Sequence, residues 1–191
     1  MAELAARAGA GEPAAAAEFV ARFYARIYAF LRRLCGQDAD AEDLTQKTFA
    51  KVWAALPGYG GRSSLNTWLH GIAHHVYADW RRQRRLPEVQ TEDWWEQCPA
   101  GEPSPFEDAA QRDEAGRLYR WVEELPAEAR ELVHLHYYQE LTLQECAEVL
   151  DVAVGTVKYR LRGAVDQLQA RARAPRPQPL PPIHQTKPQT I

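Results

Sequence analysis

Apolar residues recur every three to four positions along most of this chain, a spacing typical of amphipathic helices. In the first half it predicts helices over residues 13–35, 38–56 and 65–85, and in the second half over about 106–125 and 126–138. The first half shows none of the apolar–polar alternation that marks half-buried strands. The pattern therefore predicts an all-α fold.

Proline- and glycine-rich stretches divide these helices into two groups. Residues 87–105 contain four prolines and many acids, which predicts an acidic, flexible linker. This linker separates two small helical domains, residues 13–86 and 106–173. Residues 1–12 are rich in Ala and Gly and are predicted to be disordered. Residues 174–191 contain six prolines, which predicts a Pro-rich, disordered tail.

A helix-turn-helix is predicted in the second domain. Thr142 can cap a short helix, with Glu145 completing a capping box three residues later. A tight turn follows at Asp151, a residue type that tolerates left-handed backbone better than most. The next helix has an apolar face with Val157 and Leu161, and an opposite face that is polar and basic. This layout favours a recognition helix in a DNA major groove over an ordinary helix pair with a solvated face.

The distribution of charge supports contact with DNA at two places, although the whole chain has a formal net charge of −3. Residues 62–85 and residues 154–173 each hold five basic residues against one acid. Between them, residues 86–114 hold nine acids and one Arg. Two basic blocks around an acidic stretch are typical of a protein that grips nucleic acid with two surfaces. In the second block the candidate base-reading residues are Thr156, Lys158, Tyr159, Arg160 and Arg162.

The predicted helix over 65–85 has a polar stripe opposite its apolar core stripe. Five residues align along it and are expected to face outward: Thr67, His70, His74, Arg81 and Arg85. Two histidines four residues apart could also chelate a metal ion. The neighbouring sequence offers no third ligand and no HExxH motif. A stripe that faces DNA is therefore favoured over a metal site, and no metal is predicted.

The predicted helix over 38–56 opens with a cluster of acids. Acids in a first turn stabilise a helix through its dipole, but this need not account for all of them. Asp40, Asp43 and Lys47 point away from the core stripe. Leu44 is expected to lie exposed at the edge of this surface. An acidic patch beside an apolar residue indicates a docking surface for a basic partner.

The remaining sequence features exclude several other classes. No apolar run is long enough to cross a membrane, and the N-terminus lacks the apolar core of a signal peptide, so a cytoplasmic protein is expected. Cys35, Cys98 and Cys146 form no metal-spaced pair, and a disulfide framework is not expected. The Gly-rich loop before residue 65 lacks the spacing of a phosphate-binding loop. No cofactor is predicted.

Three stretches, in this order, resemble bacterial extracytoplasmic-function (ECF) sigma factors, the compact two-domain class of RNA polymerase specificity subunits. They are DADAEDLTQKTFAKVW, SSLNTWLHGIAHHVYADWRRQRR and LPAEARELVHLHYYQELTLQECAEVLDVAVGTVKYRL. The resemblance implies a non-enzymatic sigma factor that directs core polymerase to promoters and assists promoter opening. It also implies promoter DNA, the polymerase clamp helices and flap, and an anti-sigma factor as partners, without insertion into a membrane.

The resemblance also assigns roles to residues. The first domain would correspond to sigma region 2, and the second to region 4, whose helix-turn-helix would read the −35 element. Polymerase binding would fall to Asp40, Glu42, Asp43, Leu44, Gln46 and Lys47. Recognition and opening of the −10 element would fall to Arg62, Ser63, Ser64, Asn66, Thr67, His70, His74, His75, Arg81 and Arg85.

Two other functions fit parts of the sequence. A conventional helix-turn-helix regulator would bind DNA without polymerase, but it would need a dimer surface or a receiver domain. A helical metal-dependent enzyme would have to use histidines such as His70, His74, His134 or His136, but no nucleophile–base pair converges in the sequence. Within the sigma-factor interpretation, the histidines of the polar stripe suggest that DNA engagement strengthens as pH falls through the histidine range.

Overall fold

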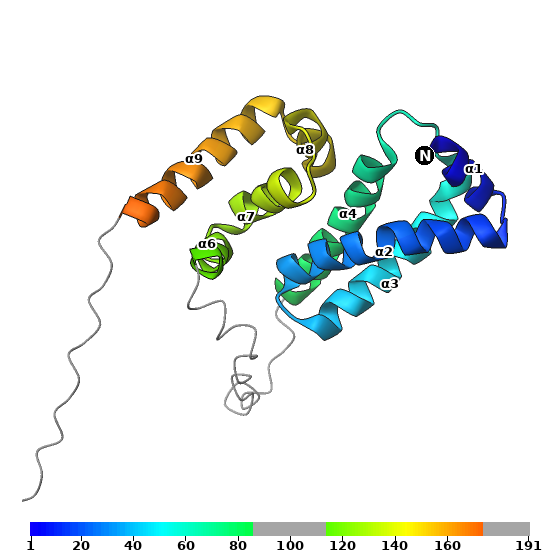
Figure 1. The fold of residues 1–191 in the computed structure, drawn as a ribbon, viewed down its shortest axis with the longest axis horizontal. Coiled ribbons are helices and arrows are strands. Elements are labelled where there is room, and N and C mark those ends of the chain that lie inside the picture. Colours follow the sequence, from blue (N-terminus) through cyan, green and yellow to red (C-terminus); the bar gives the residue numbers. More distant parts are fainter. Residues whose placement is uncertain (86–113, 174–191) are drawn as a thin grey trace, which may run out of the picture.

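A computed structural model of the chain describes residues 1–85 and 114–173. All regular secondary structure in these two ranges is helical, which confirms the predicted all-α fold. The helices form an N-terminal domain, residues 1–85, and a C-terminal domain, residues 114–173 (Figure 1). The predicted linker over 87–105 and the predicted tail over 174–191 lie outside the described residues.

The N-terminal domain is built on three long helices that pack against one another. These helices begin and end within one residue of their predicted bounds. A shorter helix and a 3-10 turn lie beside them. In chain order the elements are α1 (Ala2–Gly9), α2 (Pro13–Cys35), α3 (Asp38–Ala55), η1 (Leu56–Gly58) and α4 (Leu65–Arg85).

The sequence sets both ends of α2. Pro13 occupies the first turn, where its missing N–H is not needed by the helix. At the other end, Gly36 has a φ of 82°, a left-handed conformation that costs glycine little. The Gly36 N–H donates to the Arg32 carbonyl and closes the last turn. Between these ends, Phe19 and Phe30 are fully buried and face the other two long helices.

The prediction of disorder for residues 1–12 is wrong, because Ala2–Gly9 forms α1. Alanine has the highest helix propensity of all residues, and Leu4 is buried where α1 packs on α2. A Cβ atom on Gly9 would lie only 3.3 Å from the Leu56 backbone. The Ala- and Gly-rich composition predicts disorder, but the same small side chains allow this close packing.

The C-terminal domain is a compact set of shorter helices around α9. The π-helical turn η3 continues α7, and α7 and α8 both pack on α9. The part of the predicted helix before residue 114 lies outside the described residues. The elements are α6 (Glu114–Glu123), α7 (Ala127–Val133), η3 (His134–Tyr138), α8 (Leu143–Leu150) and α9 (Val154–Arg173).

α8, the turn after it and α9 form the predicted helix-turn-helix. Thr142 Oγ1 accepts from the Glu145 N–H at 3.2 Å, and Glu145 Oε2 accepts from the Thr142 N–H at 2.9 Å. The predicted capping box is therefore confirmed. Asp151 adopts φ 51° and ψ 49°, the left-handed backbone expected at the turn. Val157 and Leu161 are buried and anchor α9 to the rest of the domain.

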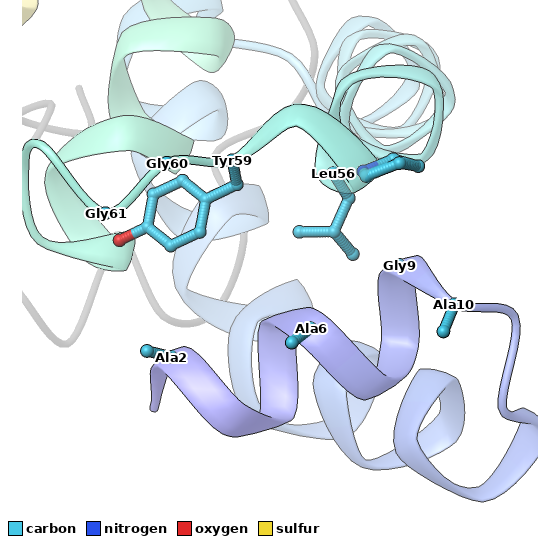
Figure 2. A pocket seen from close by; sticks show the side chains of 9 residues that line it. Ala2, Ala6, Gly9, Ala10, Leu56, Tyr59, Gly60 and Gly61 are labelled. Atoms are coloured by element: carbon cyan, nitrogen blue, oxygen red, sulfur yellow. The ribbon is translucent and has the colours of Figure 1, made fainter.

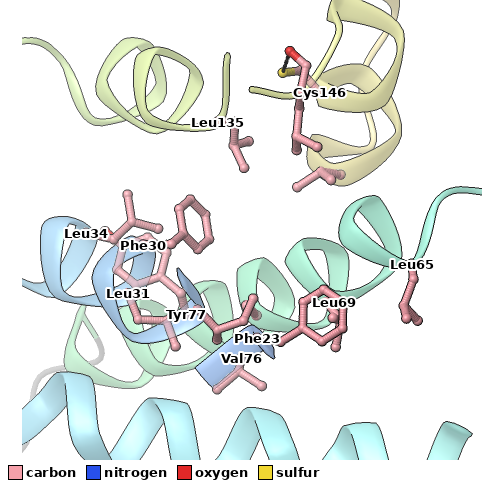
Figure 3. Packing of buried hydrophobic residues seen from close by; sticks show 14 of the residues in the cluster. Phe23, Phe30, Leu31, Leu34, Leu65, Leu69, Val76, Tyr77, Leu135 and Cys146 are labelled. Atoms are coloured by element: carbon pink, nitrogen blue, oxygen red, sulfur yellow. Dashed lines mark hydrogen bonds between the residues drawn. The ribbon is translucent and has the colours of Figure 1, made fainter. Parts of the chain in front are cut away.

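The two domains pack on each other, chiefly through α4 and α8. Their buried apolar residues belong to one continuous cluster. Figure 3 shows Leu135 and Cys146 of the C-terminal domain facing Phe30 and Leu69 of α2 and α4. We call this packed arrangement of the two domains the closed form. It places the polar stripe of α4 against the C-terminal domain.

Candidate nucleic-acid interface

The outer face of α9 presents the predicted base-reading residues to solvent. Tyr159 is 82% exposed, and Lys158 and Arg162 are exposed beside it. Arg160 is more constrained, because its Nη2 atom lies 2.7 Å from Glu128 Oε2. A basic and aromatic surface at the start of a recognition helix can donate to phosphates and to base edges. Of the five residues predicted for this face, Thr156 and Arg160 are half-buried and the other three are exposed.

The polar stripe of α4 does not face solvent as the sequence predicted. Thr67 and His70 have exposed fractions of 1% and 0%, and the His74 side chain is only 15% exposed. The expectation that these residues face outward is wrong for the closed form, because the C-terminal domain packs on α4. A periodic pattern separates an apolar face from a polar one, but it does not show whether a second domain covers the polar face.

The first turn of α4 binds the capping box of α8. Glu145 Oε1 accepts hydrogen bonds from the hydroxyls of Thr67 at 2.7 Å and Ser64 at 3.0 Å. Partial burial raises the pKa of Glu145, but hydrogen bonds from Thr67, Thr142 and Ser64 outweigh it and lower this pKa to about 2. Ionised Glu145 thus joins two elements that were predicted to bind DNA separately. Because folding lowers its pKa from 4.5, this stabilisation is present above pH 4.5 and is lost toward pH 2.

A buried ion pair joins the middle of α4 to α7. The Glu131 side chain is only 5% exposed, and its Oε1 atom lies 2.8 Å from Arg81 Nη1. Its Oε2 atom lies 3.3 Å from His74 Nε2. Removing one partner of such a pair leaves the other partner uncompensated, so these contacts oppose separation of the domains. Two residues predicted to bind DNA are therefore held by a carboxylate of the same chain.

Two arginines of α2 extend the contact between the domains. Arg26 donates from Nη2 to the Gln139 main-chain carbonyl at 2.8 Å and from Nε to the Gln139 side-chain oxygen at 3.1 Å. The Arg33 guanidinium lies 3.8 Å from the centre of the Tyr138 ring, a cation–π contact. Sequence reasoning missed Arg26, Arg33 and Glu131. A charged residue that contacts another domain has the same local sequence pattern as one that faces solvent, so no signal in the sequence identifies these three residues.

His70 is buried within this part of α4. Its ring packs edge-on against Phe30, with 5.2 Å between ring centres, and its Nδ1 atom lies 2.8 Å from the Asn66 carbonyl oxygen. Burial, together with a smaller effect of the nearby Arg26 charge, lowers the pKa of His70 to about 4, although the contacts with Asn66 and Gln139 oppose this shift. His70 is therefore neutral at pH 7 in the closed form.

The loop between η1 and α4 forms one wall of a pocket of about 540 Å³. Figure 2 shows the Tyr59 ring on the loop side and α1, with Ala2 and Ala6, on the opposite side. The Tyr59 hydroxyl donates to the Ser63 carbonyl at 2.7 Å, and Gly61 has a φ of 68°. These two features hold the loop in a tight curve. The pocket has the volume of a small-molecule site, with one aromatic ring in its wall.

The other residues predicted to act at the −10 element lie around this loop and along α4. Arg62 and His75 are exposed, whereas Ser63 and Asn66 are half-buried. Arg85 is the last residue of α4. The closed form therefore divides the predicted set into accessible residues, Arg62 in the loop and His75 on α4, and residues of the α4 polar stripe that the C-terminal domain covers.

The exposed side of α3 carries four of the predicted polymerase-binding residues: Glu42, Asp43, Gln46 and Lys47. Asp43 Oδ2 lies 2.6 Å from Lys47 Nζ, so the surface carries both charges. Asp40 lies at its edge, where its Oδ1 atom is 3.1 Å from Arg84 Nη2 on α4. The acidic patch inferred from the sequence is thus a continuous exposed surface on one helix.

Leu44 does not belong to this surface, and the expectation that it is exposed is wrong. Its exposed fraction is 0%, and so are those of Ala41 and Thr48. These residues lie three and four positions away on the same helix face, which points into the core. The Thr48 hydroxyl donates to the Leu44 carbonyl at 2.7 Å, which satisfies its own polar atom within the core. In the sequence Leu44 follows the acids Glu42 and Asp43, and this acidic neighbourhood is the reason that the pattern predicts an exposed side chain.

The described ranges hold no group of metal ligands and no helix that could span a membrane. Within residues 1–85 and 114–173, no three His, Cys, Asp or Glu side chains lie together as metal ligands. The pair proposed as a metal alternative, His70 and His74, is instead engaged with Asn66 and Glu131. In the same ranges, no helix combines the length and apolar character needed to span a bilayer.

Comparison with known families matches each domain. The Sigma-70 region 2 family matches residues 19–86, and the Sigma-70, region 4 family matches residues 115–173. The order of the two matches is the order of the two helical domains. The all-α fold, the helix-turn-helix and the two family matches together show that the chain is a two-domain protein of the Sigma-70 class.

Individual relatives narrow this class. The ECF RNA polymerase sigma factor RpoE of Cereibacter sphaeroides is 30% identical over 159 residues, covering 83% of this chain and 86% of that protein. The ECF RNA polymerase sigma factor SigE of Mycolicibacterium smegmatis is 32% identical over 154 residues, covering 80% of this chain but only 59% of that protein. A solved structure of CnrH with the cytosolic domain of CnrY is similar with a TM-score of 0.65 and 25% identity, covering 91% of this chain and 98% of CnrH. The chain belongs to the ECF RNA polymerase sigma factors, which confirms the resemblance found in the sequence.

Proposed function

We propose that this chain directs core RNA polymerase to specific promoters and assists their opening. The observation that carries the proposal is the pairing, in one ECF-family chain, of an exposed charged face on α3 with an exposed basic and aromatic face on α9. A polymerase subunit needs a surface for polymerase as well as a surface for DNA. A conventional regulator needs only the second surface, and membership of the ECF family does not favour that alternative. We assign no catalytic role to the chain, because RNA synthesis belongs to the polymerase.

The −35 element is the proposed target of α9. Lys158 and Arg162 can bind phosphates or donate hydrogen bonds to the O6 and N7 acceptors of a guanine edge, and Tyr159 adds an aromatic contact. All three are exposed in the closed form. The C-terminal domain therefore needs no rearrangement of this face before it meets duplex DNA.

Engagement of the −10 element by α4 requires the domains to separate. Thr67, His70 and His74 can reach DNA only after α7 and α8 leave α4. In the closed form, the carboxylates of Glu131 and Glu145 lie where strand phosphates would meet this stripe. When the domains separate, DNA phosphates would replace these carboxylates as partners of the stripe and so compensate for the lost interdomain contacts. The closed form would thereby disfavour binding of promoter DNA by the free chain.

The pocket beside the loop is the proposed site for an unpaired base of the −10 element. Unstacking a base costs a few kcal/mol, and stacking on an aromatic side chain returns about 1–3 kcal/mol per base. The Tyr59 ring offers such a surface, and exposed Arg62 can bind the adjoining phosphate. α1 supplies the opposite wall, so residues ahead of the region 2 match would contribute to base capture.

Core polymerase is the proposed partner of the α3 surface, through its clamp helices, and the polymerase flap is a proposed partner of the C-terminal domain. An anti-sigma factor is a further proposed partner, because the similar structure of CnrH was solved with the cytosolic domain of CnrY. We propose that these interactions take place in the cytoplasm, where polymerase and promoter DNA meet.

Run-off transcription with core polymerase and a library of promoter fragments tests the proposal. The full chain should give discrete, protein-dependent initiation. Asp43→Arg should abolish it, because the substitution reverses the charge at the centre of the exposed α3 surface. Glu18→Arg is the matched control, since Glu18 is an exposed acid on α2, away from this surface. Leu44 is unsuitable for such a test because it is buried in the core.

Each outcome separates the candidate functions. Initiation that survives Glu18→Arg but not Asp43→Arg supports a sigma factor that binds polymerase through α3. Equal activity of both variants would overturn the assignment of α3 as the polymerase surface. Tight duplex binding by the chain alone, without initiation, would favour the conventional regulator instead.

A further inference from the structure

A second surface of the C-terminal domain is apolar and open. A groove of about 380 Å³ lies between α6, η3 and α9. Its walls include Trp121 and two side chains that are unusually exposed for their type, Leu118 at 46% and Tyr137 at 57%. Contiguous exposed apolar surface of this kind usually marks a binding site. The far end of the groove is formed by Leu168 and Ala172, in the last two turns of α9.

We propose that this groove binds the chain's own C-terminal tail, residues 174–191. The tail begins two residues after Ala172, which itself lines the groove. It contains six prolines, among them the PxxP sequence Pro179–Leu180–Pro181–Pro182. Proline-rich segments of this kind dock in aromatic-lined grooves as polyproline II helices. The inference does not rest on the proposed function, since it needs only the groove and the tail.

The reach of the tail fits the length of the groove. From Val165 to Ala172 the groove follows α9 for about 10 Å, at 1.5 Å per residue. A polyproline II segment covers this distance with three to four residues, at about 3.1 Å per residue. In the proposed arrangement the tail would reverse direction over residues 174–178 and lay the four PxxP residues 179–182 antiparallel to the end of α9. Leu180 would then lie among the aromatic side chains.

Covalent attachment makes the tail a stronger candidate than a separate partner of the same chemistry. A short tether gives an effective concentration in the millimolar range. A proline-rich segment that binds only at about millimolar concentration in trans would therefore occupy the groove about half of the time in cis. The groove also suits this occupant chemically, because its walls are apolar and aromatic and one cation, Arg117, stacks on Trp121 at 5.2 Å. A nucleic acid would meet few donors there.

The docked tail would leave the predicted DNA face of α9 free. Lys158, Tyr159 and Arg162 lie in the first half of the helix, whereas the groove begins at Val165, about one turn later. The tail would therefore compete with proteins that bind this groove and not with duplex DNA.

Photo-crosslinking of the full chain tests the inference. A photoreactive phenylalanine analogue is placed at Leu180, and the crosslinked peptides of the monomer are identified by mass spectrometry. The expected product joins the tail to the peptides that contain Trp121 or Tyr137. The same analogue at Gln189, beyond the PxxP sequence, should give a yield lower by about tenfold, the effect of losing one anchored contact.

A matched pair of substitutions shows whether the crosslink depends on the groove. Tyr137→Asp should lower the Leu180 crosslink by about tenfold, the loss expected when one aromatic anchor of a groove is removed. Tyr159→Asp should leave the yield unchanged, because Tyr159 is also an exposed tyrosine of the same domain but lies outside the groove. Circular dichroism of both variants controls for folding. Crosslinks between two chains, crosslinks scattered over other surfaces, or a yield that is indifferent to Tyr137→Asp would each overturn the inference.

Discussion

The same kind of sequence pattern predicts α4 and α9, yet the polar face of α9 is exposed to solvent and that of α4 is largely buried. The face of α9 is open, with Tyr159 82% exposed. The face of α4 is covered, and His70 has no exposed surface. Both helices carry basic residues opposite an apolar stripe, so local sequence does not distinguish them. What differs is the neighbour: α4 meets the other domain, whereas α9 meets solvent.

This difference has a consequence for the proposed order of promoter recognition. A face that is already open can meet duplex DNA directly, but a covered face must first lose its internal partners. The internal partners of α4 are carboxylates and a capping box that belong to the helix-turn-helix domain. The domain that would read the −35 element thus also restrains the helix that would open the −10 element. Polymerase, by holding the domains apart, would remove that restraint.

Among the substitutions, the largest expected effect on the closed–open equilibrium comes from Glu131→Ala. The substitution removes the acceptor of Arg81 and His74 and should favour the open arrangement by about 2 kcal/mol, the lower part of the range for buried pairs. The lower part applies because Arg81 is 30% exposed and can be solvated. This corresponds to about a 30-fold shift of the closed–open equilibrium. Fluorescence energy transfer between labels at Ala21 on α2 and Asp166 on α9, both exposed, measures it.

Glu148→Ala is the control for that experiment. Glu148 is an exposed acid on α8 that is free to solvent, and its loss should leave the transfer efficiency unchanged. Helicity measured by circular dichroism should be the same in both variants. An unchanged transfer efficiency in Glu131→Ala would mean that the buried ion pair does not hold the domains together.

Arg162→Ala alters the open face and not the covered one, so its expected effect is on DNA affinity and not on the closed–open equilibrium. Loss of one base-reading or phosphate contact should weaken −35 duplex binding by the polymerase holoenzyme by about 1–3 kcal/mol. Arg22→Ala, at an exposed arginine of α2, is the matched control. Fluorescence anisotropy with labelled duplex measures both. Equal affinity of the two variants would remove Arg162 from the proposed reading surface.

Lower pH should shift the closed–open equilibrium toward the open form, in which the polar stripe of α4 is exposed. The pKa of His70 is about 4 in the closed form and 6.5 for an ordinary histidine, so the closed form binds fewer protons between these values. The closed form is therefore fully favoured above pH 6.5 and loses stability as pH falls toward 4, by at most about tenfold per pH unit. Energy transfer between the same labels should fall over this range. His70→Gln should flatten the profile, whereas exposed His75→Gln should not; a profile unchanged by His70→Gln would exclude this origin.

The sequence predicted what depends on neighbours along the chain. The bounds of α2 and α4, the capping box at Thr142 and the left-handed turn at Asp151 all follow from local propensities, and all are confirmed. What could not be predicted depends on packing between distant segments. The burial of Thr67 and His70 needs a domain that starts more than forty residues later, and no local period reports it. α1 was missed for a related reason, because its stability comes from contacts with α2 and η1 and not from a strong apolar stripe of its own.

The smallest expected effect on the closed–open equilibrium comes from Gln139→Ala, which tests how much the contact between α2 and the buried Gln139 contributes. The substitution removes the side-chain acceptor of Arg26 Nε but leaves the main-chain carbonyl that accepts from Nη2. Loss of this acceptor should favour opening by about 1.5 kcal/mol, the low end for a hydrogen bond to a charged group, because Arg26 is partly exposed and keeps its bond to the main-chain carbonyl. This corresponds to a shift of about tenfold. Gln167→Ala, at an exposed glutamine of α9, should have no effect on energy transfer. A shift as large as that of Glu131→Ala would place the main restraint at α2 and not along α4, and would reverse the assignment of Glu131 as the chief contact between the domains.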